Sequence, residues 1–142
     1  MVAYFDATFI AKAYVNEPES DRVREFVAKS SRILTSAISV VEVEAAFHRQ
    51  FREGRLTAEQ ARELGAQFEQ DMQNVWTPVP MTPDILKRTA LRFRILPQNV
   101  FLRAGDAIHL VSALEARSDE IWTNDRRLLA AAPHFGLLGR TI

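Results

Sequence analysis

Apolar and polar positions divide the chain into short apolar runs that alternate with longer amphipathic segments. The short runs predict strands at 1–5, 32–38, 75–81, 120–123 and 137–142. Apolar residues at helical spacing predict helices at 8–15, 20–30, 39–51, 57–72, 82–94, 104–116 and 125–132. The alternation predicts an α/β fold with a mostly parallel central sheet of about four or five strands, flanked by helices on both faces. The third strand carries two prolines, which suit an edge or an end of the sheet.

The composition is that of an ordinary folded protein. The chain has 142 residues, of which 47% are hydrophobic and 25% charged, and no repeat or linker divides it, so we expect one domain over residues 1–142. It contains no cysteine, which excludes disulfides, thiolate metal sites and cysteine nucleophiles and fits a reducing cytoplasm. No apolar run approaches the roughly 18 residues of a membrane span, and the N-terminus does not resemble a signal peptide. We therefore expect a cytoplasmic protein without membrane contact.

The charge balance restricts how the protein can bind nucleic acid. Eighteen Lys and Arg residues balance 18 Asp and Glu residues, so binding by bulk positive charge is excluded and only a local basic strip can serve. Arg88, Arg92 and Arg94 form such a strip on one predicted helix. They could contact an RNA backbone, although charge on a solvated helix face is the commoner explanation for such a strip.

Four acidic residues lie near the carboxyl ends of predicted strands or in the first turns of helices, where parallel sheets bind their ligands. Asp6 and Asp125 each follow a predicted strand, Asp106 opens the helix at 104–116 that is predicted to be buried, and Glu42 lies in the first turn of the helix after the second strand. Two carboxylates about 4 Å apart repel by roughly 4 kcal/mol at an effective dielectric of about 20, so four together need raised pKa values or a cation between them. Ligation by oxygen alone favours Mg²⁺ or Mn²⁺, which can activate a water and clamp phosphoryl oxygens.

Each acid also has a purely structural interpretation. Asp6 and Asp125 could cap the helices that follow them, and Asp106 could complement a helix dipole. Glu42 fits a capping box that begins at Ser39. A helical wheel, moreover, places Glu44 rather than Glu42 on the apolar side of its helix.

Four segments carry a family resemblance that spans nearly the whole chain. Residues 6–12 (DATFIAK), 36–42 (a strand-end Ser followed six residues later by Glu), 102–110 (LRAGDAIHL) and 122–128 (WTNDRRL) resemble, in this order, the four motifs of PIN-domain proteins. The short chain is similar to the VapC-type toxins of toxin–antitoxin pairs. One position departs from the pattern: Ala7 stands where a hydroxyl residue is common, but Thr8 keeps the more characteristic hydroxyl.

The resemblance implies a function and a site. It implies a ribonuclease that depends on Mg²⁺ or Mn²⁺, cleaves RNA, and is neutralised by a cognate antitoxin, with a homodimer as a common arrangement. The antitoxin would place an Arg or Lys in the acidic pocket and apolar residues along a groove. The catalytic and metal-ligating residues would be Asp6, Glu42, Asp106 and Asp125, so the resemblance selects Glu42 over Glu44.

Further residues would support these acids. Thr8 and Thr123 could fix the rotamers of the acidic side chains through hydrogen bonds. Asn124 is a candidate for the same supporting role or for contact with the substrate. Arg103 could touch a phosphate or form a surface salt bridge. His109 is expected to be a packed histidine or one at the rim of the site rather than a general base, because a metal-activated water needs no histidine.

Two other classes of function remain open on the sequence. A phosphotransferase or receiver-like domain that uses Asp and Mg²⁺ also places acids at strand ends, but no second Asp follows Asp6 and no acidic pair follows a strand. A non-catalytic PIN scaffold that binds RNA or protein would not need to retain all four acids.

Overall fold

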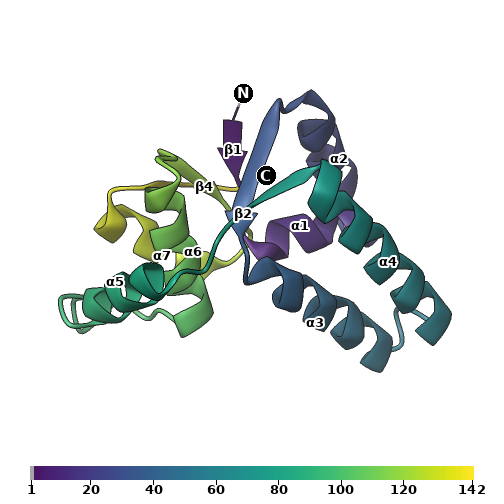
Figure 1. Ribbon diagram of the computed structural model, residues 1–142. Coiled ribbons are helices and arrows are strands. Elements are labelled where there is room, and N and C mark those ends of the chain that lie inside the picture. The colour runs from purple at the N-terminus through teal and green to yellow at the C-terminus, as the bar shows by residue number, and fades with distance from the viewer. Residues whose placement is uncertain (1) are drawn as a thin grey trace.

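The computed structural model of the protein describes residues 2–142 (Figure 1). The chain runs β1 (Val2–Tyr4), α1 (Ala7–Tyr14), α2 (Ser20–Lys29), β2 (Arg32–Ser36), α3 (Ser39–Arg52), α4 (Ala58–Asn74), β3 (Trp76–Val79), α5 (Pro83–Phe93), α6 (Ala104–Glu115), β4 (Glu120–Trp122), α7 (Arg126–Ala131), a 3₁₀ helix (Ala132–Phe135) and β5 (Leu138–Arg140). Every predicted strand and helix is present with shifted ends. Met1, which the sequence pattern places in the first strand, lies outside the described residues.

The strands of the described residues pair only in parallel. One sheet has the order β1-β2-β3, and a smaller sheet pairs β4 with β5. A single bridge between Phe5 and Trp122 joins the two sheets, supported by a hydrogen bond of 3.1 Å from the Asp6 amide to the Trp122 carbonyl. The predicted parallel sheet is therefore confirmed, but as three strands plus two. Strand β3, which contains Pro78, lies at an edge as predicted, because a proline there removes no hydrogen bond from a central ladder.

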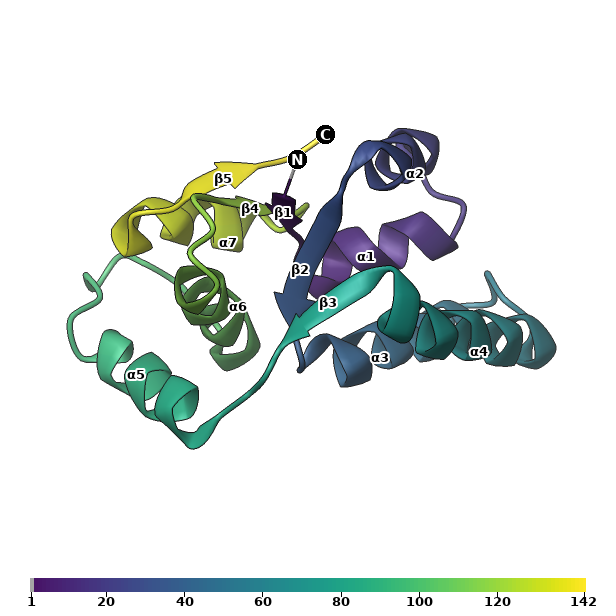
Figure 2. The ribbon, with the colours of Figure 1, turned by 45° about the horizontal axis from the view of Figure 1, so that its top comes forward.

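Helices cover both faces of the sheet. In Figures 1 and 2, α1 to α4 lie on one side of the strands and α5 to α7 on the other. Successive strand residues point to opposite faces, so the strands feed two cores. Phe5, Ile33 and Trp76 pack with α1 to α4, whereas Tyr4 and Leu34 pack with α5 to α7.

Capping residues determine where several helices begin. Thr57 accepts a hydrogen bond from the Gln60 amide, and the Gln60 side chain accepts one from the Thr57 amide, which completes the predicted capping box of α4. Thr82 caps α5 and Pro83 occupies its first turn, where a missing N–H costs nothing. No helix of the described residues is both long and apolar enough to cross a membrane.

Candidate acidic active site

The four candidate acids lie at the carboxyl ends of the strands. Asp6 follows β1 and Asp125 follows β4, and these two strands are neighbours through the Phe5–Trp122 bridge. Glu42 lies in the first turn of α3, which follows β2, and Asp106 lies in the first turn of α6. Ligands of open parallel sheets bind at this edge, where the loops after the strands converge.

Asp6 is the most deeply buried of these acids, with 2% of its surface exposed. Its Oδ1 accepts hydrogen bonds from the Thr8 hydroxyl at 2.7 Å and from the Phe9 amide at 3.0 Å, and its Oδ2 accepts one from the Thr123 hydroxyl. Burial raises the pKa of Asp6, while the charge of His109 and these donors act in the opposite direction. The carboxylate is thus held in one orientation at an energetic cost that a nearby cation would relieve.

Asp125 serves both as a helix cap and as part of the site. Its Oδ1 accepts hydrogen bonds from the Arg127 amide at 2.8 Å and from the Leu128 amide at 3.3 Å, which caps α7. Its own amide donates to the Thr123 hydroxyl at 3.0 Å, so one threonine links Asp125 to Asp6. The capping interpretation holds for both Asp6 and Asp125, and Oδ2 of Asp125 takes no part in the cap but pairs with Arg103.

Arg103 bridges two of the acids. Its guanidinium lies 3.0 Å from Asp125 Oδ2 and 3.5 Å from Asp106 Oδ2. Burial raises the pKa of Asp106, the Asp125 charge raises it further, and Arg103 lowers it. Among the described residues, Asp106 Oδ2 is buried without a hydrogen-bond partner. The Arg103 side chain is 60% exposed, so its ion pairs contribute little to the stability of the fold. Another cation can therefore replace Arg103 beside these carboxylates at small cost.

Glu42 is held by a buried polar pair. Its Oε1 lies 2.6 Å from His109 Nε2, and His109 Nδ1 lies 2.9 Å from the Tyr4 hydroxyl. Burial raises the pKa of Tyr4, so this phenol keeps its proton. A carboxylate only accepts hydrogen bonds, so His109 Nε2 is the donor to Glu42. A Cβ at Gly105 would lie 3.0 Å from Glu42 Oε2. His109 is only 1% exposed, which confirms the expected packed histidine.

Glu44 points away from these groups. Its carboxylate lies over Gly65 of α4, where a Cβ would come within 2.9 Å of both carboxylate oxygens. The wheel-based preference for Glu44 is therefore wrong, because the buried stripe of α3 runs through Val43 and Phe47 and leaves Phe51 exposed. The stripe borders α4 on the Glu44 side and the site on the Glu42 side.

The alternative capping role of Glu42 is also wrong. Helix α3 begins after Ile38, and no side chain caps it. The Ser39 hydroxyl instead forms a buried hydrogen bond of 2.7 Å with Thr35, so no Ser39–Glu42 capping box forms. Glu42 is thereby free to bond with His109.

The donor chemistry of the site fits a hard divalent cation. All four acids offer oxygen, the pKa values of Asp6 and Asp106 are raised, and Asp106 Oδ2 lacks a hydrogen-bond partner. Within residues 2–142, however, no three Asp, Glu or His side chains lie close enough together to hold a metal ion. In this arrangement Arg103 pairs with Asp106 and Asp125, and His109 bonds to Glu42. A cation would need Arg103 to turn away into solvent.

Arginines of the predicted basic strip on α5 form contacts with other side chains of the same chain. Arg88 pairs with Glu115 and Asp84, and the Arg92 guanidinium lies 4.8 Å from the centre of the Phe135 ring. The structure therefore favours the structural interpretation of Arg88 and Arg92.

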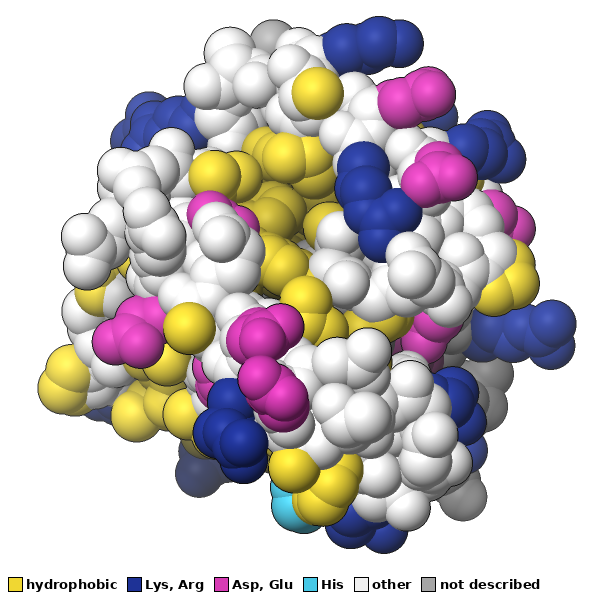
Figure 3. Space-filling model, turned by 90° about the vertical axis from the view of Figure 1, so that its right-hand side faces the viewer, with side chains coloured by type: hydrophobic (Ala, Val, Ile, Leu, Met, Phe, Trp, Pro, Cys, Tyr) yellow, Lys and Arg dark blue, Asp and Glu magenta, His cyan; other side chains and the backbone are white. Residues whose placement is uncertain are grey.

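The opposite side of the molecule, which carries α2 and α4, is shown in Figure 3. There, charges of both signs surround a hollow lined by hydrophobic side chains.

Sequence reasoning missed several residues around the site. The sequence pattern marks Tyr4 as an ordinary strand residue, and only the fold shows that its hydroxyl bonds to His109 Nδ1. Lys12, Arg49 and Arg55 come from α1, α3 and the loop after α3, and they border one hollow next to Thr8. Their separation in sequence hides this arrangement, since no local motif joins residues 12, 49 and 55.

The fold and the acids together define a parallel α/β protein with an acidic site at the carboxyl ends of its strands. The sequence matches the PIN domain family over residues 3–133, and the chain belongs to that family. A comparison with curated protein sequences gives no match.

Several solved structures share the fold at low sequence identity. VapC20 of Mycobacterium tuberculosis, described as a toxin that cleaves the sarcin–ricin loop, is 14% identical with a TM-score of 0.69, over 92% of this chain and 95% of that chain. FitAB bound to a DNA fragment is 15% identical with a TM-score of 0.71, over 99% and 94%. VapBC2 of Rickettsia felis, bound to promoter DNA, is 11% identical with a TM-score of 0.69, over 100% and 99%.

Proposed function

We propose that this protein is an endoribonuclease that depends on Mg²⁺ or Mn²⁺ and is the toxin of a VapC-type toxin–antitoxin pair. The observation that carries the proposal is the convergence of Asp6, Glu42, Asp106 and Asp125 on one edge of the sheet, linked through Thr123, Arg103 and His109. Membership of the PIN domain family supports it, as does the fold shared with the RNA-cleaving VapC20.

The residues divide the work of phosphodiester hydrolysis. Asp6 and Asp106 would ligate the cation, with Glu42 and Asp125 completing its surroundings. When bound, the cation supplies a water of lowered pKa and neutralises charge that develops on the phosphate. Thr8 and Thr123 hold the Asp6 carboxylate through hydrogen bonds, and Arg103 is placed to exchange its carboxylate partners for a substrate phosphate.

His109 holds Glu42 rather than taking a proton from water. Its two nitrogens are already bonded to Tyr4 and Glu42, so neither is free to act as a general base in this arrangement. The buried Tyr4–His109–Glu42 chain restricts the Glu42 carboxylate to one position, which is the role of outer residues around a catalytic cation.

A cognate antitoxin is the proposed protein partner. FitAB and VapBC2 are solved as complexes with DNA, which supports a toxin that forms an antitoxin complex. The Arg103 guanidinium between Asp106 and Asp125 indicates that this pair accepts a planar cation, so an antitoxin arginine could take the same place. A homodimer, the single domain over 1–142 and the cytoplasmic location stay predictions.

The function is tested with purified protein and structured RNA in the presence of Mg²⁺ or Mn²⁺. We expect cleavage that excess chelator abolishes and that Asp6→Asn and Asp106→Asn reduce by at least about 100-fold, with unchanged circular dichroism. Asp84→Asn is the matched control, because Asp84 is an exposed acid of α5 outside the site. Equal cleavage in excess chelator would contradict the proposal.

A PIN scaffold without catalysis is the second candidate, favoured by the absence of a preformed three-ligand metal cluster in residues 2–142. It predicts that expression inhibits growth equally in wild type and in the Asp6→Asn variant. The nuclease predicts that the variant loses growth inhibition. RNA ends sequenced after induction of each protein would also reveal the cleaved target.

A further inference from the structure

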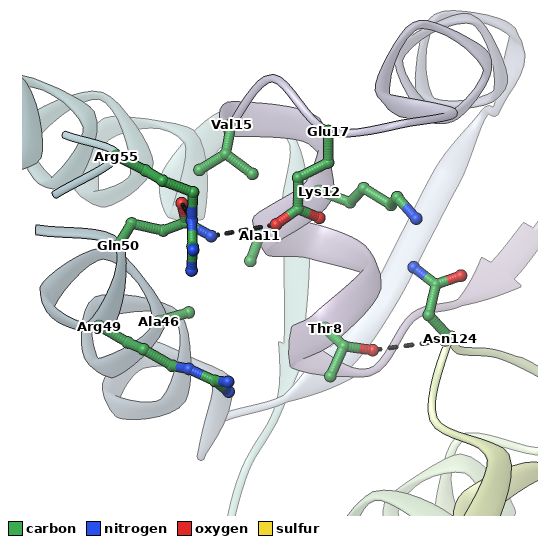
Figure 4. A pocket seen from close by; sticks show the side chains of 10 residues that line it. All are labelled: Thr8, Ala11, Lys12, Val15, Glu17, Ala46, Arg49, Gln50, Arg55 and Asn124. Atoms are coloured by element: carbon green, nitrogen blue, oxygen red, sulfur yellow. Dashed lines mark hydrogen bonds between the residues drawn. The ribbon is translucent and has the colours of Figure 1, made fainter. Parts of the chain in front are cut away.

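A hollow of about 310 Å³ opens beside the acids, between α1 and α3 (Figure 4). Thr8 and Asn124 form the end nearest the acids, and they are joined by a hydrogen bond of 3.4 Å from the Asn124 amide to the Thr8 hydroxyl. The Thr8 hydroxyl itself donates to Asp6. The hollow is therefore continuous with the proposed catalytic centre and extends away from it along α1.

Three cations border this hollow. Figure 4 shows the side chains of Lys12, Arg49 and Arg55 around it, from α1, α3 and the loop after α3. Lys12 pairs with Glu19 at 3.5 Å, and both arginines pair with Glu53. The arginine pairs are solvent-exposed and contribute little to stability, so a phosphate can replace the carboxylate at small cost.

The floor of the hollow differs chemically from its rim. Ala11, Val15 and Ala46 supply apolar surface, whereas Glu17 and Gln50 form a polar wall joined by a hydrogen bond of 3.0 Å. An apolar floor with cations at the rim matches the two parts of a nucleotide, a flat base and a charged phosphate. A volume of about 310 Å³ is at the small end of ligand pockets.

We propose that this hollow binds the nucleotide of single-stranded RNA that flanks the cleaved bond, with one phosphate held by Arg49 and Arg55, which already share the Glu53 carboxylate, and the adjacent phosphate beside Lys12. The inference rests on the proposed ribonuclease function and adds the path of the substrate. It also accounts for RNA binding by a chain of zero net charge, because the basic groups are concentrated beside the acids rather than spread over the surface.

Glu17 should oppose RNA binding, whereas the lysine and arginines around the hollow should favour it. It is the acid among the residues that line the hollow, and its charge acts on Arg49. A carboxylate beside a bound phosphate repels it, so removal of this charge strengthens RNA binding. A purely structural role for this group of residues does not predict effects of opposite sign.

The test measures binding of a short fluorescent single-stranded RNA to protein that carries Asp6→Asn, which prevents cleavage during the measurement. We expect Lys12→Gln and Arg49→Gln each to weaken binding about fivefold, and Glu17→Gln to strengthen it. Each lysine or arginine change should also reduce the slope of log affinity against log salt by about 0.7. Lys87→Gln on α5 is the matched control, because Lys87 is exposed on the opposite side of the sheet.

The outcomes separate this inference from the proposed function. If the wild-type protein cleaves RNA but Lys12→Gln and Arg49→Gln bind like Lys87→Gln, the subsite is refuted and the ribonuclease stands. If these variants bind RNA normally but lose binding of a peptide from the antitoxin, the hollow is a protein-binding groove and the subsite is again refuted. If the wild-type protein cleaves no RNA in Mg²⁺ or Mn²⁺, the proposed function itself fails.

Discussion

The substitution Gly105→Ala should displace the Glu42 carboxylate without destabilising the fold. Gly105 lies in the first turn of α6, and an added Cβ would lie 3.0 Å from Glu42 Oε2. The carboxylate must then retreat by a few tenths of an ångström, which disturbs its 2.6 Å contact with His109 Nε2. No other heavy atom lies closer to this Cβ, so the change acts on Glu42 alone.

The expected effects on folding and on function have opposite signs. Alanine is a better helix former than glycine by up to about 1 kcal/mol, so the melting temperature should stay the same or rise by about 2–4 °C. Displacement of an outer contact of a metal ligand typically costs about 10- to 100-fold in metal affinity or activity. A factor of 10 corresponds to about 1.4 kcal/mol, which is within the value of one hydrogen bond to a charged group.

Gly65→Ala is the matched control. Its Cβ would come within 2.9 Å of both Glu44 carboxylate oxygens, so it imposes the same kind of displacement on a glutamate outside the site. We would measure Mn²⁺ affinity by calorimetry, RNA cleavage, and thermal unfolding for both variants. Gly105→Ala should lose metal affinity and cleavage, and Gly65→Ala should keep both. Equal behaviour of the two variants, whether both active or both impaired, would refute the role assigned to Glu42.

Three further predictions concern the other acids and their partners. Because burial raises the pKa of Asp6, the metal-free Asp6→Asn variant should unfold at the same or a higher temperature than wild type, and Mn²⁺ should stabilise only wild type; a destabilised variant would show that the charge is already compensated. Thr123→Val removes a donor to Asp6 and an acceptor for the Asp125 amide, so urea unfolding should show a loss of about 2–4 kcal/mol, and a loss below about 1 kcal/mol would contradict this network. Arg103→Gln removes the cation between Asp106 and Asp125, so Mn²⁺ should bind more tightly in calorimetry; weaker binding would mean that Arg103 organises these acids for the metal.

The strands and helices could be predicted because local pattern and capping agree with the fold. The capping box at Thr57 and the first-turn Pro83 mark their helices directly, and Pro78 indicates the edge position of β3. A helical wheel could not predict which side of α3 faces the core and which side faces the site. Its buried stripe depends on which neighbours surround the helix, and α4 draws Glu44 to one side while the site takes Glu42 on the other.

The site could be predicted as a set of acids but not as an arrangement. Spacing along the chain identifies Asp6 and Asp125 at strand ends, and the structure shows that both also cap helices, so the two interpretations were never exclusive. The connections among the acids are long-range. The hydroxyl of Thr123 reaches Asp6 across 117 residues and His109 reaches Glu42 across 67, so only the closed fold reveals them.

The narrow junction between the two sheets lies directly beneath the acids. Asp6 continues the three-stranded sheet and Asp125 continues the two-stranded one, and the Phe5–Trp122 bridge is the backbone pairing that keeps the halves together. A divalent ion held by Asp6 and Asp125 would add one more link across that boundary, beside the Thr123–Asp6 hydrogen bond and the packing of Tyr4 and Leu34 against α6. Loading with Mn²⁺ should accordingly slow hydrogen–deuterium exchange at the Asp6 amide, whose proton is bonded to the Trp122 carbonyl on the far side of the junction.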